Sequence, residues 1–526
     1  MGGNAILMKQ NKHDGFACVS CAWEKPAVPH AFEYCENGAK ATAWEITSKR
    51  VGPDFFAGHT LAELRGWRDH DLEAIGRLTQ PMRWDPHSDT YRPVTWEDAF
   101  REIGVELRRL KPEEAVFYVS GRASLEASYM WQLFARLYGT NNLPDSSNMC
   151  HESTSVALPE SVGQPVGTTS LTDFSHTDCI MFFGQNPGSN SPRMLHPLQE
   201  ASKRGVPIIT FNPLRERGLE RFTNPQSPTE MLTGKETRIS SQYHQVKAGG
   251  DIAAIMGLCK ALIEADDAGE PLLDHDFIAQ HTQGFEDFAR AARKTDWADI
   301  EQESGLTRPA LEGVARCYGK SKAVMAIYGM GLTQHRRGVE NVQMLVNLLL
   351  LRGNIGKEGA GICPVRGHSN VQGQRTIGIS EKPELVPLDK LAEQYNFPPR
   401  EKGMNTVEAC EAVLDGRVRA FLSLGGNFLR AVPETGPMEE AWPRLRLSVQ
   451  IATKLNRSHL VPAEVTYLLP CLGRIEIDTQ RAGPQTVSME DSNGQIHPLA
   501  ACRSRPASIC GRSPPSSPGS RRPPCR

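Results

Sequence analysis

The chain has 526 residues and a formal net charge of −2, with 23% charged and 39% hydrophobic residues. This length is too great for one simple core and predicts several domains. The near-neutral charge gives no electrostatic reason to expect nucleic acid or an anionic membrane as a partner. No apolar run approaches the roughly 20 residues that span a bilayer. Residues 1–12 contain neither an apolar signal-peptide core nor a twin-arginine pair, so a cytoplasmic location is expected.

The first ninety-five residues contain short segments that aromatic, Gly and Pro residues interrupt, which is typical of an irregular cap. Two cysteines there, Cys18 and Cys21, are separated by two residues, and Cys35 follows them. In a reducing compartment such spacing indicates metal or redox chemistry, but zinc, a disulfide or no function at all stay open. An iron–sulfur cluster ordinarily takes four thiolates, so a fourth ligand here would be His30, Glu33 or water.

A regular succession of helices and strands begins near Thr95, which is the predicted N-cap of a helix over residues 96–110. Short apolar runs bounded by Gly or Asn predict buried strands over residues 115–119, 179–183, 207–211, 323–328, 420–424 and 447–451. Helical patterns predict further helices over residues 124–137, 192–204 and 339–351. The alternation favours an α/β fold with parallel sheets.

Residues 179–211 predict a β-α-β unit with a right-handed crossover. Ligands of such sheets bind at the carboxyl ends of the strands. Small or amide residues follow several predicted strands and suit a phosphate or a purine; they are Gly184, Gln185, Asn186, Asn212, Gly329, Gly331, Gln334, Gly425 and Asn427. The sequence has no G-x-G-x-x-G motif, so an NAD-binding fingerprint is not supported.

Cys150 and His151 form a dipeptide between a predicted helix and a segment of small residues. A thiolate is a soft metal ligand and a nucleophile, and an imidazole beside it can move a proton near neutral pH. When the dipeptide is taken alone, a buried structural cysteine next to a surface histidine is the favoured explanation, because free Cys is among the most buried residue types. Residues 363–373 are polar and bracketed by glycines around Arg366, which is typical of a functional loop or of a surface loop with one ion pair.

Several segments in order resemble the molybdopterin oxidoreductases, and formate-dehydrogenase-like alpha subunits in particular. The matching segments are Cys18-x-x-Cys21-Ala22-Trp23, Gly329-Met330-Gly331-Leu332-Thr333-Gln334, Leu351-Arg352-Gly353-Asn354-Ile355-Gly356-Lys357 and Pro364-Val365-Arg366-Gly367-x-x-Asn370-Val371-Gln372-Gly373. Cys150-His151 falls where that family places its metal-binding cysteine or selenocysteine and the adjacent histidine. The resemblance covers about residues 14–500.

The resemblance implies a multi-domain α/β fold that holds a bis(molybdopterin guanine dinucleotide) with molybdenum or tungsten, near a [4Fe-4S] cluster. It makes Cys150 the metal ligand and His151 the proton acceptor. Arg366 would orient a carboxylate substrate through bidentate hydrogen bonds. Cys18, Cys21 and Cys35 would bind the cluster, and Lys40 would lie between the cluster and the pterin. The strand-end residues named above would hold the two guanine dinucleotides.

The implied domains are a cluster-binding cap over residues 1–95, a pterin domain over 96–147 and 370–500, and a second pterin domain over 148–369 that carries Cys150. Two departures from the family pattern stand out. Lys25 occupies the place of the third cluster cysteine, and the match ends near Ala500, before the family's C-terminal β-barrel domain. Residues 501–526 are rich in Pro, Ser, Arg and Cys and are expected to be disordered. A truncated or frameshifted reading frame explains this ending.

The predicted function is the two-electron oxidation of formate or a similar small acid. Electrons would leave through the cluster to an acceptor protein, and the cofactor would carry the redox chemistry. Two alternatives are an inactive truncated remnant and a zinc-binding interaction protein that uses Cys18, Cys21 and Cys35. Metal content distinguishes the three.

Overall fold

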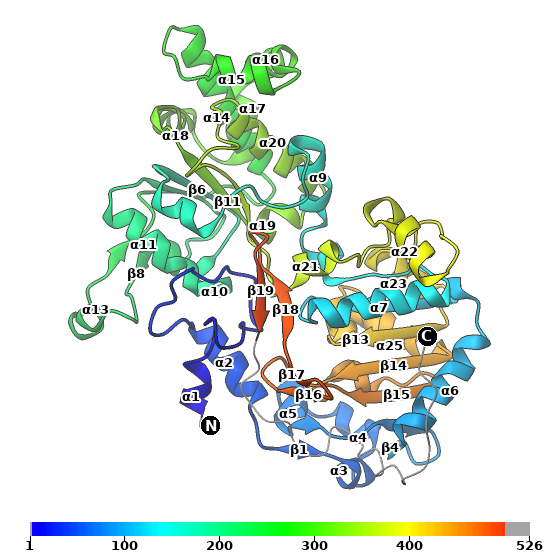
Figure 1. Cartoon of the computed structure of the whole chain (residues 1–526). Helices are drawn as coiled ribbons and strands as arrows, with labels where there is room; N and C mark the ends of the chain where they lie inside the picture. The colour runs from blue at the N-terminus through cyan, green and yellow to red at the C-terminus, as the bar shows by residue number, and fades with distance from the viewer. Residues whose placement is uncertain (1–2, 500–526) are drawn as a thin grey trace.

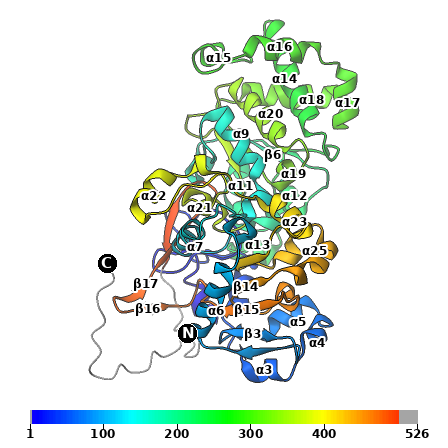
Figure 2. The same cartoon turned by 90° about the vertical axis from the view of Figure 1, so that its right-hand side faces the viewer.

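A computed structural model describes residues 3–499. The predicted disorder of residues 501–526 concerns a part of the chain outside this range. Two α/β lobes, each built on its own sheet, lie one above the other in Figure 1, and a group of helices extends from the upper lobe. The view in Figure 2, turned by 90°, shows the same elongated arrangement. The predicted α/β class with parallel sheets is confirmed.

The upper lobe contains a five-stranded sheet in which every neighbouring pair of strands is parallel. In spatial order the strands are β10 (Gln242–His244), β7 (Ile208–Phe211), β6 (Cys179–Phe183), β11 (Val324–Tyr328) and β12 (Gly361–Pro364). The predicted β-α-β unit is present as β6, a 3₁₀ turn (Pro192–Met194), α11 (Leu195–Lys203) and β7. The single helix predicted over residues 192–204 is therefore divided, with Pro192 opening the short turn.

Both faces of this sheet are covered, which explains the uninterrupted apolar runs of its strands. Met181 and Phe183 belong to one hydrophobic cluster with α14 (Asp251–Asp267) and α20 (Gly338–Leu350). Ile180 and Phe182 point to the other face, where they share a cluster with α11 and with Trp23 from the N-terminal region. The helices that extend beyond α14 are α15 (His275–His281), α16 (Phe285–Lys294), α17 (Trp297–Ser304) and α18 (Arg308–Lys320).

The lower lobe contains a six-stranded sheet with four parallel strands and two antiparallel ones at its edge. In spatial order the strands are β4 (Thr90–Pro93), β3 (Met82–Asp85), β15 (Val465–Pro470), β14 (Leu447–Ala452), β13 (Ala420–Leu424) and β5 (Ala115–Val119). Helices α6 (Trp96–Arg108) and α7 (Leu125–Tyr138) cover one face. Helices α23 (Thr406–Leu414) and α25 (Thr435–Ala441) cover the other.

Strands β3 and β4 come from the region that the sequence analysis assigned to an irregular cap, so the lower sheet extends into residues 1–95. Both strands are only four residues long and partly exposed, which leaves little apolar pattern to detect. The rest of that region forms short elements around them. They are α1 (Gly3–Leu7), α2 (Glu36–Glu45), β1 (Arg50–Val51), α3 (Pro53–Ala57), α4 (Leu61–Arg65), α5 (Asp69–Ala74) and β2 (Arg77–Leu78).

The segment predicted as a loop over residues 363–373 is shorter than expected. Cys363 and Pro364 pair with Ile327 and Tyr328 as the end of β12, and Val371 begins α21 (Val371–Thr376). Pro364 is compatible with a strand here because β12 is the edge of its sheet. The loop proper is therefore residues 365–370, between the upper and the lower lobe.

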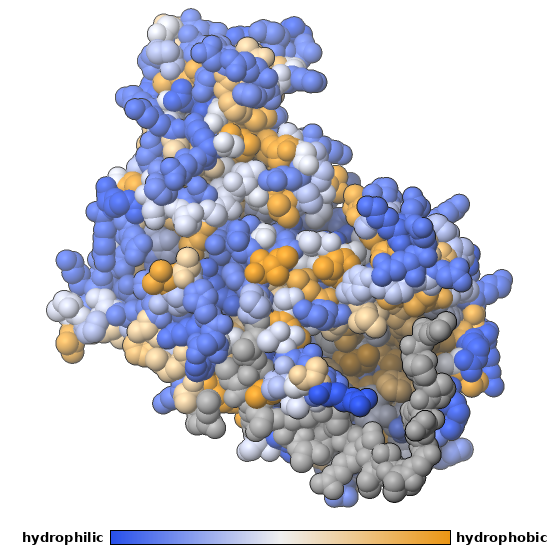
Figure 3. Space-filling model, in the orientation of Figure 1, coloured by the Kyte–Doolittle hydropathy of each residue, from blue (hydrophilic) through white to orange (hydrophobic). Residues whose placement is uncertain are grey.

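After the lower sheet the chain forms two hairpins, β16 (Asp478–Gln480) with β17 (Gly483–Gln485) and β18 (Val487–Glu490) with β19 (Ile496–Leu499). The second hairpin rises between the lobes, beside the N-terminal region (Figure 1). In Figure 3, hydrophobic residues gather at the middle of the face while the helices at the top are mainly hydrophilic. Among residues 3–499, no helix combines the length and the hydropathy that crossing a bilayer requires. The cytoplasmic location stays a prediction.

The loops after β6 and β11 approach each other through two glycines. Gly331, in α19 (Met330–Thr333), donates its N–H to Gly184 O at 3.0 Å, and a Cβ on Gly331 would lie 2.6 Å from that same oxygen. We expect Gly331→Ala to push these loops apart and to lower the stability by about 1–3 kcal/mol, the usual cost of overpacking. Thermal denaturation followed by circular dichroism measures the change.

Gly313→Ala is the matched control. Gly313 lies inside α18, and a Cβ there meets nothing within 4 Å. Only the higher helix propensity of Ala then contributes, so we expect the free energy of unfolding to rise by up to about 1 kcal/mol. Equal melting temperatures for Gly331→Ala and the wild type would contradict the close approach.

Candidate functional site

Cys150 is the last residue of a short helix that stands between the two lobes. This helix, α8 (Ser146–Cys150), begins at Asp145, whose carboxylate accepts the N–H of Asn148 at 3.1 Å. At its other end, Thr333 Oγ1 donates to the carbonyl of Cys150 at 2.7 Å, and Gln334 Nε2 donates to that of Met149 at 2.7 Å. The start of α8 is thus fixed next to the lower sheet, and its end is capped by the loop after β11.

His151 is completely buried and hydrogen bonded at both ring nitrogens. Its Nε2 lies 3.0 Å from the carbonyl of Val365, and its Nδ1 lies 3.0 Å from Thr154 Oγ1. A carbonyl only accepts, so Nε2 carries the proton and Nδ1 accepts from Thr154. Thr154 in turn lies 2.8 Å from the hydroxyl of Tyr328, which completes the chain of hydrogen bonds.

Burial and the nearby Arg366 cation lower the pKa of His151 to about 3. The sequence analysis expected an imidazole that can move a proton near neutral pH, and burial of this ring lowers its pKa below that range. The imidazole is neutral at physiological pH. To accept a proton, it would first have to give up its bond from Thr154.

Arg366 is a buried cation without a carboxylate partner among the described residues. Its side chain is 2% exposed, and only Nη2 has a hydrogen bond, to the carbonyl of Pro165 at 3.1 Å. Nε and Nη1 are buried without any acceptor. Leaving charged donors unsatisfied in the interior is costly, so this guanidinium suits an anion that residues 3–499 do not supply.

The Cys150 thiol lies close enough to the Arg366 guanidinium for each group to affect the pKa of the other. Burial raises the pKa of Cys150, while a hydrogen bond from the N–H of Gly367 and the charge of Arg366 oppose the increase. In turn, the negative charge of an ionised Cys150 raises the pKa of Arg366 and so opposes the lowering of that pKa by burial. The structure therefore brings together Cys150, His151 and Arg366, and the roles that the resemblance gives them stay predictions.

A second arginine near α8, Arg375, has carboxylate partners on all sides. Its Nε lies 3.2 Å from Asp145, its Nη2 2.9 Å from Glu152 and its Nη1 3.3 Å from Glu381. Lys382 adds an ion pair to Glu152 at 2.8 Å. Burial would lower the pKa of Arg375, but the three carboxylates raise it. This network holds the residues on both sides of Cys150-His151 to α21 and the segment after it.

The three N-terminal cysteines lie near one another beneath the upper lobe. Burial, followed by the neighbouring Cys21, raises the pKa of Cys18 to about 12, and burial raises the pKa of Cys35. Backbone N–H groups donate to two of the sulfurs, from Ser20 to Cys18 Sγ at 3.3 Å and from Gly38 to Cys35 Sγ at 3.4 Å. Within residues 3–499, no group of three or more His, Cys, Asp or Glu side chains is arranged to hold a single metal ion.

Lys40 does not lie in this interior. Its side chain is 73% exposed and pairs with Glu36 at 2.6 Å on the outside of α2. The predicted position between the cluster and the pterin therefore gains no support from its contacts.

The strand-end residues predicted to bind a cofactor form two groups. Gly184, Gly329 and Gly331 pack closely, and Gln185 beside them has a buried Nε2 without a partner. Asn212 bonds to the carbonyl of Leu214 at 3.1 Å. In the lower lobe, Gly425 has a φ of 72° and Asn427 Oδ1 accepts from Ser458 Oγ at 2.8 Å. Neither Gly425 nor Asn427 lies with the first group, because they follow β13 of the other sheet.

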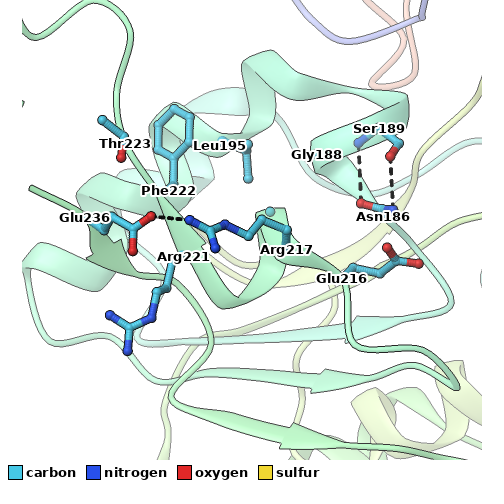
Figure 4. A pocket seen from close by; sticks show the side chains of 11 residues that line it. Asn186, Gly188, Ser189, Leu195, Glu216, Arg217, Arg221, Phe222, Thr223 and Glu236 are labelled. Carbon is cyan, nitrogen blue, oxygen red and sulfur yellow. Dashed lines mark hydrogen bonds and ion pairs between the residues drawn. The ribbon is translucent and has the colours of Figure 1, made fainter. Parts of the chain in front are cut away.

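A pocket of about 370 Å³ opens beside the end of β6 (Figure 4). Asn186 and Ser189 lie on one side of it, and Arg217, paired with Glu236, lies on the other. The remaining lining residues are Gly188, Leu195, Glu216, Gly218, Arg221, Phe222 and Thr223. Its size and mixed polar lining are typical of a site for a small organic group.

The sequence analysis missed Thr154, Tyr328 and Arg375. Thr154 stands three residues after His151 on α9 (Glu152–Val162), so helical spacing could have indicated it. Tyr328 is the last residue of a predicted strand, where side chains of a parallel sheet reach a ligand. Arg375 had no local signal, because all its carboxylate partners except Glu381 are more than 200 positions away.

Comparison with known proteins identifies the family. The molybdopterin oxidoreductase family matches residues 77–454. The chain belongs to this family. Protein YdeP of Shigella flexneri is 50% identical over 498 residues, which cover 93% of this chain and 66% of YdeP. Formate dehydrogenase H of Escherichia coli is 27% identical over 442 residues, which cover 79% of this chain and 58% of that enzyme.

Among solved structures, acetylene hydratase from Pelobacter acetylenicus aligns with a TM-score of 0.65 and 16% identity, over 93% of this chain and 64% of that one. At this identity the likeness concerns the fold alone. This molybdopterin oxidoreductase spans between 58% and 66% of the length of these relatives. The family implies a molybdenum or tungsten pterin cofactor.

The residues present fit such a group. The unpartnered amide of Gln185 is a donor that a polyanionic pterin nucleotide would satisfy, and the two unpartnered nitrogens of Arg366 leave donors for a second anion. Cys150 supplies a soft ligand beside them. For an iron–sulfur cluster the fit is partial: three thiols lie together with N–H groups directed at two of the sulfurs, but a fourth ligand is not identified.

The Arg375 network gives a direct test of how α8 is held. Arg375→Met removes the cation that pairs with both Asp145 and Glu381, and leaves buried carboxylates close together. We expect a loss of about 3–5 kcal/mol, the usual cost of breaking a buried ion pair from one side. Chemical denaturation of the purified protein measures it.

Arg417→Met is the control, because Arg417 pairs with Asp415 at an exposed position. That change should leave the denaturation curve where it is. An Arg375→Met variant as stable as the wild type would show that the network does not fix α8.

Proposed function

We propose that this molybdopterin oxidoreductase oxidises formate or a similarly small carboxylate at a molybdenum or tungsten centre held by a bis(molybdopterin guanine dinucleotide). We further propose that a [4Fe-4S] cluster near Cys18, Cys21 and Cys35 passes the electrons to an acceptor protein. The observation that carries the proposal is the buried guanidinium of Arg366, with two unpartnered nitrogens, beside the Cys150 thiol.

The side chains divide the work as follows. Arg366 can present Nε and Nη1 to both oxygens of a carboxylate, a bidentate geometry that orients the substrate. Cys150 holds the metal through its sulfur once the thiol has lost its proton. His151 is neutral and fixed at both nitrogens, and its bond to the carbonyl of Val365 holds the segment of Cys150 to the loop that carries Arg366. In this proposal His151 first positions the site, and it accepts a proton only after Thr154 turns away.

The bound metal and its pterins would supply the acceptor for the two electrons that formate releases on conversion to carbon dioxide and a proton. The pocket beside Asn186 and Arg217 would take part of one dinucleotide, since its volume and its polar lining suit a heterocycle with a phosphate. The loop at Gly425 and Asn427 would take part of the other.

Metal analysis of the anaerobically purified chain tests the proposal. We expect molybdenum or tungsten together with iron. Zinc alone would favour an interaction protein built on the three N-terminal cysteines, and the absence of all these metals would favour an inactive remnant.

Substitutions at the site test the roles. Cys150→Ser should change the paramagnetic resonance signal of the molybdenum or tungsten centre and remove turnover, because the hard hydroxyl replaces a soft ligand. Arg366→Lys keeps the charge but loses the planar fork, so KM for formate should rise about ten- to hundredfold. Arg417→Lys, at the surface, is the control. An unchanged KM in Arg366→Lys would remove Arg366 from the substrate site.

A further inference from the structure

Two free thiols meet where the helical extension joins the upper sheet. Cys179 is the first residue of β6 and Cys317 lies near the end of α18, and both belong to the same hydrophobic cluster. The Cys179 thiol donates a hydrogen bond to the sulfur of Cys317. The pair lies at the opposite end of β6 from Gly184, so it takes no part in the site described above.

Backbone hydrogen bonds fix the two elements to each other at this point. The carboxylate of Asp178 accepts the N–H groups of Lys322 at 2.9 Å and Ala323 at 3.0 Å. The N–H of Asp178 donates in turn to the carbonyl of Ala323 at 3.0 Å. The segment that leaves α18 is therefore attached to the residue directly before Cys179, which keeps the two sulfurs together.

The two thiols differ in exposure and in acidity. Cys179 is completely buried, whereas Cys317 is half-buried at the edge of the cluster. The hydrogen bond from Cys179 lowers the pKa of Cys317 to about 7, against the effects of burial and of Asp178, and Lys320 adds to the lowering. The same hydrogen bond, together with burial, raises the pKa of Cys179 well above its ordinary value. At neutral pH a part of Cys317 is therefore ionised while Cys179 keeps its proton.

Other buried thiols of the chain show what is unusual here. Burial raises the pKa of Cys259, and it raises the pKa of Cys410 to about 12. Within the described part of the chain, neither of them is hydrogen bonded to a second thiol. An accessible thiolate with a protonated thiol beside it is the arrangement that reacts with an oxidant and then closes a disulfide.

We propose that Cys317 and Cys179 form an oxidation site for a small hydroperoxide, in which Cys317 is the attacking thiolate and Cys179 the resolving thiol. The site is independent of the cofactor in the proposed function. It would join α18 to the first residue of the strand whose other end leads to the pocket in Figure 4.

The reaction has two steps. The sulfur of Cys317 attacks one peroxide oxygen, the O–O bond breaks, and the second oxygen takes up a proton and leaves as water or an alcohol. Cys317 is now a sulfenic acid. The sulfur of Cys179 then displaces the hydroxyl group from Cys317, which forms the S–S bond, and the hydroxyl leaves with the Cys179 proton as water. Two electrons pass from the two thiols to the peroxide.

Peptide mapping of the whole purified chain, treated with an equimolar amount of hydrogen peroxide, tests the proposal. Remaining thiols are alkylated, and the chain is cut at aspartate as well as at lysine and arginine. Cleavage at Asp178 separates Cys179 from Cys150, which otherwise share one peptide. We expect a peptide that joins Cys179 to Cys317 and that a dithiol reductant separates, while Cys410 stays a free thiol.

Two substitutions separate the roles of the two thiols. In Cys179→Ser we expect a sulfenic acid at Cys317, captured by dimedone, and no disulfide. In Cys317→Ser the buried Cys179 should stay reduced, because its raised pKa leaves almost no thiolate. Cys410→Ser is the matched control and should form the disulfide as the wild type does. If a variant does not fold, the wild-type map alone decides the proposal.

The proposal is overturned if Cys317 in the wild type is oxidised no faster than Cys410, or if oxidised Cys317 is joined to a cysteine other than Cys179. It is also overturned if Cys179 is oxidised as readily in Cys317→Ser as in the wild type, because the buried thiol would then react without its neighbour.

Discussion

The hydrogen bond from His151 to the carbonyl of Val365 joins the helix that carries Cys150 to the loop that carries Arg366. Asp145, at the start of that helix, lies beside the last residue of β5 in the lower sheet, while Val365 directly follows β12 of the upper sheet. One short helix thus spans the space between two lobes that otherwise have separate cores. The arrangement depends on a neutral imidazole, since a protonated Nδ1 could no longer accept the bond from Thr154.

The sequence allowed six strands of the two sheets, β5, β6, β7, β11, β13 and β14, to be predicted to within one residue, because a parallel strand covered on both faces is a continuous apolar run. The sequence analysis did not find β10, β12 or β15. Strands 115–119, 179–183 and 420–424 agree with β5, β6 and β13. It did not reveal β3 and β4, whose edge position requires so little apolar surface that no pattern remains. The loop predicted over residues 363–373 included two strand residues for a related reason. Cys363 and Pro364 belong to a strand only because they pair with β11.

The sequence analysis also named the three residues that the structure brings together, Cys150, His151 and Arg366, through their order along the chain and the family resemblance. What could not be found were the contacts that fix them. Two carboxylate partners of Arg375, Asp145 and Glu152, lie more than 200 positions away in the sequence, and spacing along the chain carries no information about such pairs. Lys40 shows the converse, since proximity to Cys35 in sequence does not determine the side of a helix on which a side chain lies.

The distribution of buried charge separates two kinds of arginine in this protein. Arg77, Arg193 and Arg375 have carboxylate partners, and their charges contribute to the folded chain as it stands. Arg366 has none, and its Nε and Nη1 have no acceptor among the described residues, so its burial opposes folding until an anion arrives. A group that binds only the folded chain stabilises it by an amount that grows with the logarithm of its concentration over its dissociation constant. The cation that prepares the site for an anion therefore also links the stability of the fold to the binding of that anion.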